Sequence, residues 1–186
     1  MISKPARRKE IIDWSLLAFS TLIVFSTLSF VRALFDRIVH AGLENMLRLS
    51  IVSLLAALAV VLVLWLIWFA KVRSPLVYLQ TAGIFAAYAI VLMTLSEMPV
   101  ERIHLMEYGV LGCLAHRALR HRCAGRERFL LAVLITLNLG LGDELIQGLL
   151  PRRFYDPKDV MVNAVSGLLG VLVATIIART RINNEQ

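Results

Sequence analysis

Residues 51–70 read IVSLLAALAVVLVLWLIWFA, a run without a single charged side chain. An α-helix rises about 1.5 Å per residue, so this run is long enough to cross the roughly 30 Å hydrocarbon core of a bilayer. The whole chain agrees, because 59% of its 186 residues are hydrophobic and only 18% are charged. A soluble domain typically has about 25% charged residues. The run therefore predicts a membrane-spanning helix in an integral membrane protein.

Four other apolar runs predict further spans, at residues 14–31, 75–95, 129–150 and 160–178. Residues 103–118 predict a shorter and more polar helix, which is either a tilted span or an amphipathic helix at the membrane surface. We therefore expect an all-α, polytopic transmembrane bundle of about six helices. In this single membrane domain, residues 1–95 hold the first three helices and residues 96–179 hold the three polar ones. The first span is expected to be an uncleaved signal-anchor helix, since no convincing small-residue cleavage site follows it.

Basic residues indicate the orientation of the bundle. If all six helices span, the 20 Lys and Arg residues divide 13 to 7 between the two sides. The positive-inside rule assigns the larger share, and with it both termini, to the cytoplasm. The arginine-rich segment 116–128, which includes His116 and His121, is then expected to be a solvated cytoplasmic loop. Basic clusters that lie between apolar runs, with no soluble domain beside them, exclude nucleic acid as a partner.

Polar side chains gather at the ends of the last three helices that this topology places outside the cell. His104 and Tyr108 are four residues apart and share one helix face, and Glu144 and Gln147 share another. A third face carries Asp159, Asn163, Gly167 and Gly170. A charge within a bilayer costs several kcal/mol unless it is paired or hydrated. We therefore expect a shared polar pocket, with the two glycines in close contact with a neighbouring helix.

The polar residues form an ordered set that resembles the signature of VanZ-like proteins: His104 with Tyr108, Glu144 with Gln147, Pro151-Arg152-Arg153, Asp156, Asp159, Asn163 and Gly167. The resemblance covers about residues 101–178. It implies a multi-pass protein of the bacterial inner membrane that is associated with glycopeptide resistance of the teicoplanin type. It implies no particular reaction.

Three functions are compatible with these residues. The first is a non-enzymatic envelope protein that binds or shields an anionic lipid or a peptidoglycan precursor. Its ligand-binding residues would be Tyr108, Gln147, Arg152, Arg153, Asp156 and Asn163, because arginine pairs well with phosphate and carboxylate groups. The second is an intramembrane enzyme that acts on a lipid-linked envelope substrate, with catalytic residues His104, Glu107, Glu144 and Asp159. There His104 would be the general base, Glu107 or Glu144 would orient it, and Asp159 is the alternative base.

The third function, a transporter or channel element, ranks below these because the first three helices offer few polar faces. Each polar residue alone also has an ordinary structural interpretation, as a helix cap or as one partner of an ion pair. No cofactor is expected. Two carboxylates and a histidine can bind a divalent metal ion, but nothing in their spacing requires one. Membrane lipids are the expected partners, and an oligomer is compatible with the sequence.

Overall fold

The computed structural model describes residues 4–94, 99–150 and 154–184. Within these ranges the chain is helical and contains no β-strand. The elements are α1 (Lys4–His40), α2 (Glu44–Trp68), α3 (Pro75–Thr94), α4 (Pro99–Ala118), the 3-10 turn η1 (Leu119–His121), α5 (Gly125–Leu149) and α6 (Pro157–Asn184). Segments of α1, α2, α3, α5 and α6 are long and apolar enough to cross a membrane. The predicted all-α membrane bundle is confirmed.

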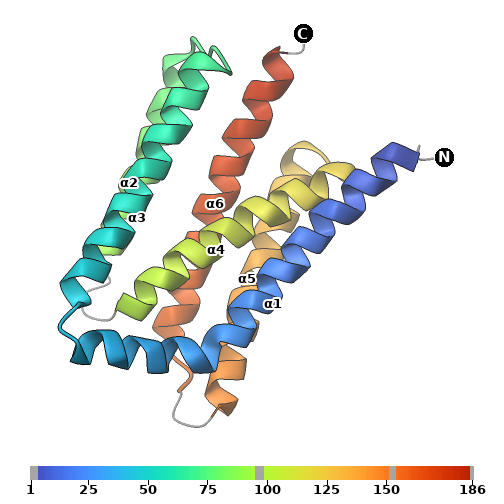
Figure 1. The fold of residues 1–186 in the computed structure, drawn as a ribbon. Coiled ribbons are helices and arrows are strands. Elements are labelled where there is room, and N and C mark those ends of the chain that lie inside the picture. Colours follow the sequence, from blue (N-terminus) through green and yellow to red (C-terminus); the bar gives the residue numbers. More distant parts are fainter. Residues whose placement is uncertain (1–3, 95–98, 151–153, 185–186) are drawn as a thin grey trace.

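The first helix continues well beyond the predicted span. Residues 35–40 were expected in a connection between two helices, but α1 includes them and ends at His40. No proline or glycine lies between Pro5, in the first turn of α1, and Gly42, which adopts a left-handed φ of 70° that favours glycine. The last part of α1 crosses the lower end of the bundle in Figure 1, and there Phe35 is buried.

The polar helix α4 lies inside the bundle and not on its surface. It contacts α1, α2, α5 and α6, and in Figure 1 it runs between α1 and the α2–α3 pair. Its residues Leu105, Tyr108, Leu111 and Ala115 are at most 1% exposed. A helix in this position presents its polar side chains to other helices, so its low hydropathy does not require a place at the membrane surface.

Helices α4 and α6 approach each other backbone to backbone. A Cβ atom on Gly112 would collide with the carbonyl oxygen of Gly167, and one on Gly170 would collide with the carbonyl oxygen of Gly109. The Cys113 thiol donates a hydrogen bond of 3.1 Å to the Gly170 carbonyl oxygen across the same contact. The predicted close contact of Gly167 and Gly170 with a neighbouring helix is confirmed, and α4 is one of the neighbours.

At the opposite end of α4, the expected solvated loop is wrong in part. His116 is buried, and its Nε2 lies 3.1 Å from Arg128 Nε and 3.3 Å from Thr175 Oγ1. Asp13 of α1 is also buried, and its carboxylate pairs with the basic side chains of Arg117, Arg120 and His121. The basic segment binds α1 to α4 because a buried carboxylate requires partners of opposite charge.

Candidate functional site

A set of buried polar side chains lies where the beginning of α4, the end of α5 and the beginning of α6 meet, at the lower end of Figure 1. We call this set the polar cluster. Apart from the partly buried Glu107, each member is at most 4% exposed. Its members are His104, Glu107, Tyr108, Asp143, Glu144, Gln147 and Asn163.

His104 lies between two carboxylates. Its Nδ1 atom is 3.4 Å from Glu107 Oε2, one turn along α4, and 3.7 Å from Asp143 Oδ2 on α5. The imidazole also contacts Tyr108, with the two ring centroids 6.2 Å apart. A histidine beside a carboxylate has the composition of a general base with its orienting group. The geometry therefore brings together His104 and Glu107, two of the residues predicted for catalysis.

Glu144 and Asp143 share a partner on α5. Gln147 Nε2 donates to Glu144 Oε1 at 2.9 Å and to Asp143 Oδ2 at 3.3 Å. The backbone N–H of Asp156 donates to the other Glu144 oxygen at 3.3 Å. The Asp156 carboxylate is exposed and accepts a bond of 2.8 Å from the Lys158 backbone N–H, as a helix cap does.

Asn163 completes the cluster from α6. Its side chain is fully buried, and neither its amide nitrogen nor its amide oxygen has a hydrogen-bond partner among the described residues. A Cβ atom on Gly140 would lie 2.8 Å from Asn163 Cβ and 3.4 Å from Tyr108 Cε1, so only a glycine at this position admits both side chains. The Tyr108 hydroxyl donates to the Leu139 carbonyl oxygen at 3.3 Å.

The described residues therefore bring together six of the ten residues predicted for the site, and place two others outside the polar cluster. Those in the cluster are His104, Glu107, Tyr108, Glu144, Gln147 and Asn163. Asp159 is partly buried in the first turn of α6, and the Asp156 side chain points to solvent as a cap. Arg152 and Arg153 lie outside the described residues.

Asp143 is the residue that the sequence-based assignment of roles left out. It is fully buried, and it contacts both His104 and Gln147. The signal was its spacing, because Asp143 and Gln147 are four residues apart and share a helix face. The adjacent Glu144 satisfied the same pattern, and only the neighbouring helices show that both carboxylates point inward.

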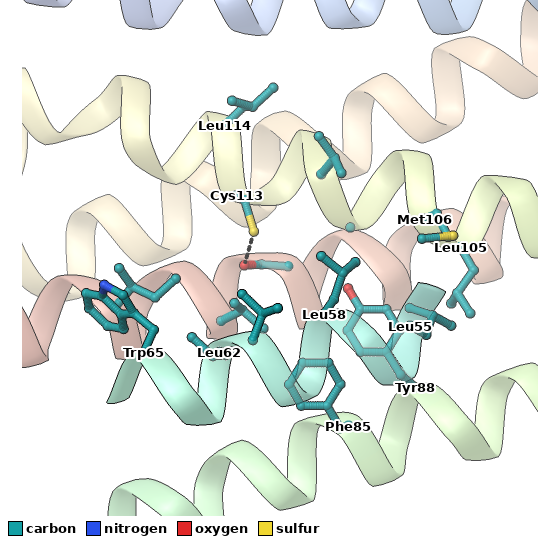
Figure 2. Close-up of a pocket in the computed structure, with 16 residues that line it drawn as sticks. Leu55, Leu58, Leu62, Trp65, Phe85, Tyr88, Leu105, Met106, Cys113 and Leu114 are labelled. Carbon is teal, nitrogen blue, oxygen red and sulfur yellow. Dashed lines mark hydrogen bonds between the residues drawn. The ribbon is translucent and has the colours of Figure 1, made fainter. Parts of the chain in front are cut away.

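An apolar cavity of about 480 Å³ lies on the other side of the α4–α6 contact, between α2, α3, α4 and α6 (Figure 2). Trp65, Tyr88 and Leu105 are among its lining residues, and Leu58 and Val61 on its rim are exposed. Its α4 lining begins at Leu105, the residue directly after His104. The cavity thus runs from the level of the polar cluster along the apolar interior, and its rim faces the surroundings of the bundle.

Comparison with known proteins gives one positive result. A model of the VanZ/LLP1 family matches residues 12–178, from the first helix to the last. Curated proteins and solved structures gave no match.

Proposed function

Because the chain belongs to the VanZ/LLP1 family, we propose that this multi-pass membrane protein binds an anionic lipid or lipid-linked peptidoglycan precursor of the bacterial envelope. The bound head group would occupy the polar cluster at the extracytoplasmic ends of α4, α5 and α6. Binding or shielding such a precursor would link the protein to glycopeptide resistance of the teicoplanin type.

One observation carries this proposal: a buried polar cluster and a long apolar cavity begin at the same level of α4. An amphipathic ligand needs both, since its head group seeks hydrogen bonds and its hydrocarbon chain seeks apolar surface. The exposed rim residues Leu58 and Val61 supply a lateral entrance for a chain that arrives from the bilayer. Arg152 and Arg153 come three and four residues after the end of α5 in the sequence and would supply positive charge for a phosphate.

A binding measurement tests the proposal. Protein in nanodiscs is titrated with phosphatidylglycerol and with a polyprenyl-linked precursor mimic. Arg153→Ala and Leu58→Trp, which narrows the cavity rim, should each weaken binding about tenfold, equivalent to about 1.4 kcal/mol. Leu54→Trp is the matched control, because Leu54 is similarly exposed on α2 and does not line the cavity. Unchanged affinities in both test variants would refute the assignment of the ligand site.

Resistance is tested separately in cells. Expression in a susceptible host should raise the teicoplanin concentration that inhibits growth, and Arg153→Ala should abolish most of that gain. An equal gain for both proteins, at equal membrane levels, would disconnect resistance from the proposed site.

The contact of His104 with Glu107 favours the second candidate, an intramembrane enzyme that acts on a lipid-linked substrate. His104 would take a proton from the attacking group, and Glu107 would orient the imidazole. Lipid extracts from cells with the wild-type protein and with His104→Ala should then differ in one substrate–product pair. Identical lipid extracts would refute the enzyme, and the binding function would be the remaining candidate.

The proposed orientation is testable by cysteine labelling in a background with Cys113 and Cys123 replaced. Cysteines introduced at Ser96, which lies outside the described residues, and at Lys158 should react with an impermeant reagent added from outside. A cysteine at Ala124 should not react, because the positive-inside rule places its arginine-rich surroundings in the cytoplasm. The opposite labelling pattern would invert the bundle and place the polar cluster at the cytoplasmic face.

A further inference from the structure

The polar cluster contains a group with the composition of a metal site. One ligand atom each from His104, Asp143 and Glu144 lies within 4.8 Å of the other two, and all three side chains are buried. The three residues come from two helices, so α4–α5 packing and not local sequence spacing creates the group. The sequence shows residue types that can bind a metal ion, but their spacing along the chain does not require one.

Charge is the first reason to assign an ion. Asp143 and Glu144 are neighbours in sequence, and both are 0% exposed. Two buried carboxylates repel each other, and each disfavours the ionised form of the other unless a cation lies between them. His104 can carry only one positive charge. A divalent ion would neutralise both carboxylates at once.

Unused polar atoms are the second reason. Asp143 Oδ1 and both amide atoms of Asn163 are buried without a hydrogen-bond partner among the described residues. Such atoms are rare in folded proteins, and an ion that the structure does not contain is a standard explanation. Asn163 lies against Gly140, which is one turn before Asp143 and Glu144 on α5.

We propose that His104, Asp143 and Glu144 bind a divalent transition-metal ion, with Zn²⁺ the first candidate. One imidazole nitrogen and two carboxylate oxygens match the ligands of zinc sites with three protein ligands, in which metal–ligand distances are about 2.0–2.2 Å. Around such an ion the ligand atoms lie about 3.4 Å apart, so small side-chain rotations close the site. An imidazole ligand suits zinc, copper, iron or nickel better than calcium or magnesium.

This site deepens the proposed function and rests on it for the identity of the fourth ligand. A metal held by three protein ligands keeps a coordination position for another oxygen. A phosphate or carboxylate oxygen of the envelope ligand fits that position. The metal site itself depends only on the contacts within the polar cluster.

Metal binding is measured on the full-length protein in nanodiscs after treatment with a chelator. Wild-type protein should take up one Zn²⁺ per chain in competition with a chromophoric chelator. Co²⁺ should give visible absorption bands of a nitrogen- and oxygen-ligated ion. Asp143→Asn and Glu144→Gln should each weaken Zn²⁺ binding about 100-fold or more, since each removes a charged ligand.

The matched control is His116→Ala. His116 is also a buried histidine of α4, but it lies at the other end of the helix. This variant should keep the wild-type affinity for Zn²⁺. Less than 0.5 Zn²⁺ per wild-type chain, or equal affinity in all variants, would overturn the proposal.

Thermal unfolding shows whether each variant is folded, and it tests the metal site independently of lipid binding. Without metal, Asp143→Asn and Glu144→Gln should unfold at or above the wild-type temperature, because each removes one of two buried carboxylates that repel each other. Added Zn²⁺ should stabilise only the wild-type protein and the His116→Ala control. Stabilisation of the two cluster variants by Zn²⁺ would contradict the site. Zinc binding without lipid binding would refute the proposed function and leave the metal site standing. Lipid binding without zinc binding would refute the metal site and leave the proposed function standing.

Discussion

The contact between α4 and α6 yields a prediction whose size can be worked from the structure. In Gly170→Ala the new Cβ atom would lie 2.8 Å from the Gly109 carbonyl carbon and 3.0 Å from its Cα, and closer still to its carbonyl oxygen. Ordinary van der Waals contact begins at 3.4 Å. The colliding atoms belong to the backbone and cannot rotate away, so the two helices must separate by roughly half an ångström or more.

Overpacking of this kind costs about 1–3 kcal/mol. Alanine is also the better helix former, by up to about 1 kcal/mol, which offsets part of the cost. We therefore expect a net loss of about 1–2 kcal/mol in the free energy of unfolding. The change should also lower ligand affinity, because α4 and α6 carry His104 and Asn163 into the polar cluster.

The assay is unfolding in mixed micelles with increasing dodecyl sulfate, followed by circular dichroism. Two other glycines provide a graded control. A Cβ atom on Gly83 would meet nothing within 4 Å, so Gly83→Ala should be neutral or slightly stabilising. A Cβ atom on Gly109 would meet the hydroxyl end of the Tyr88 side chain and no backbone atom, so Gly109→Ala should cost less than Gly170→Ala. A Gly170→Ala protein as stable as Gly83→Ala would refute the backbone-contact reasoning.

Two further substitutions test the contacts of α4 at its opposite ends, each by unfolding in mixed micelles. Asp13→Asn should lower stability by about 1–3 kcal/mol, because it leaves Arg117 and His121 without their buried carboxylate; added salt should reduce the difference only slightly, since Asp13 is buried. Tyr108→Phe should cost about 0.5–1.5 kcal/mol through the lost hydrogen bond to Leu139. A loss below 0.3 kcal/mol would show that this bond is not formed.

Much of the fold could be predicted because a bilayer imposes local rules. A helix must satisfy its own backbone hydrogen bonds in lipid, so an apolar run such as residues 51–70 indicates a span without knowledge of its neighbours. The residues that share one face of a helix can likewise be predicted from their spacing, because residues three or four apart lie on the same side. This is why Glu144 with Gln147, and Gly167 with Gly170, were assigned correctly to shared faces.

The missed features depend on which helices become neighbours. Nothing near Asp13 in the sequence indicates that its partners lie more than 100 residues away on α4 and η1. His116 has the flanking residues of a solvated loop, but α5 and α6 enclose it. Asp143 and Glu144 could both point inward only because α4 and α6 cover the end of α5 from two sides. Such contacts between distant segments leave no local pattern.

The central position of the polar helix α4 has a consequence for how the protein is made. A segment that carries Glu101, Arg102, His104 and Glu107 is a poor substrate for insertion on its own, since each charged group costs a few kcal/mol during transfer into lipid. Its partners α5 and α6 are synthesised later. We therefore expect α4 to enter the membrane together with α5, as a hairpin joined by the arginine-rich turn. On this route the polar cluster would be completed last, when α6 packs against α4 and α5.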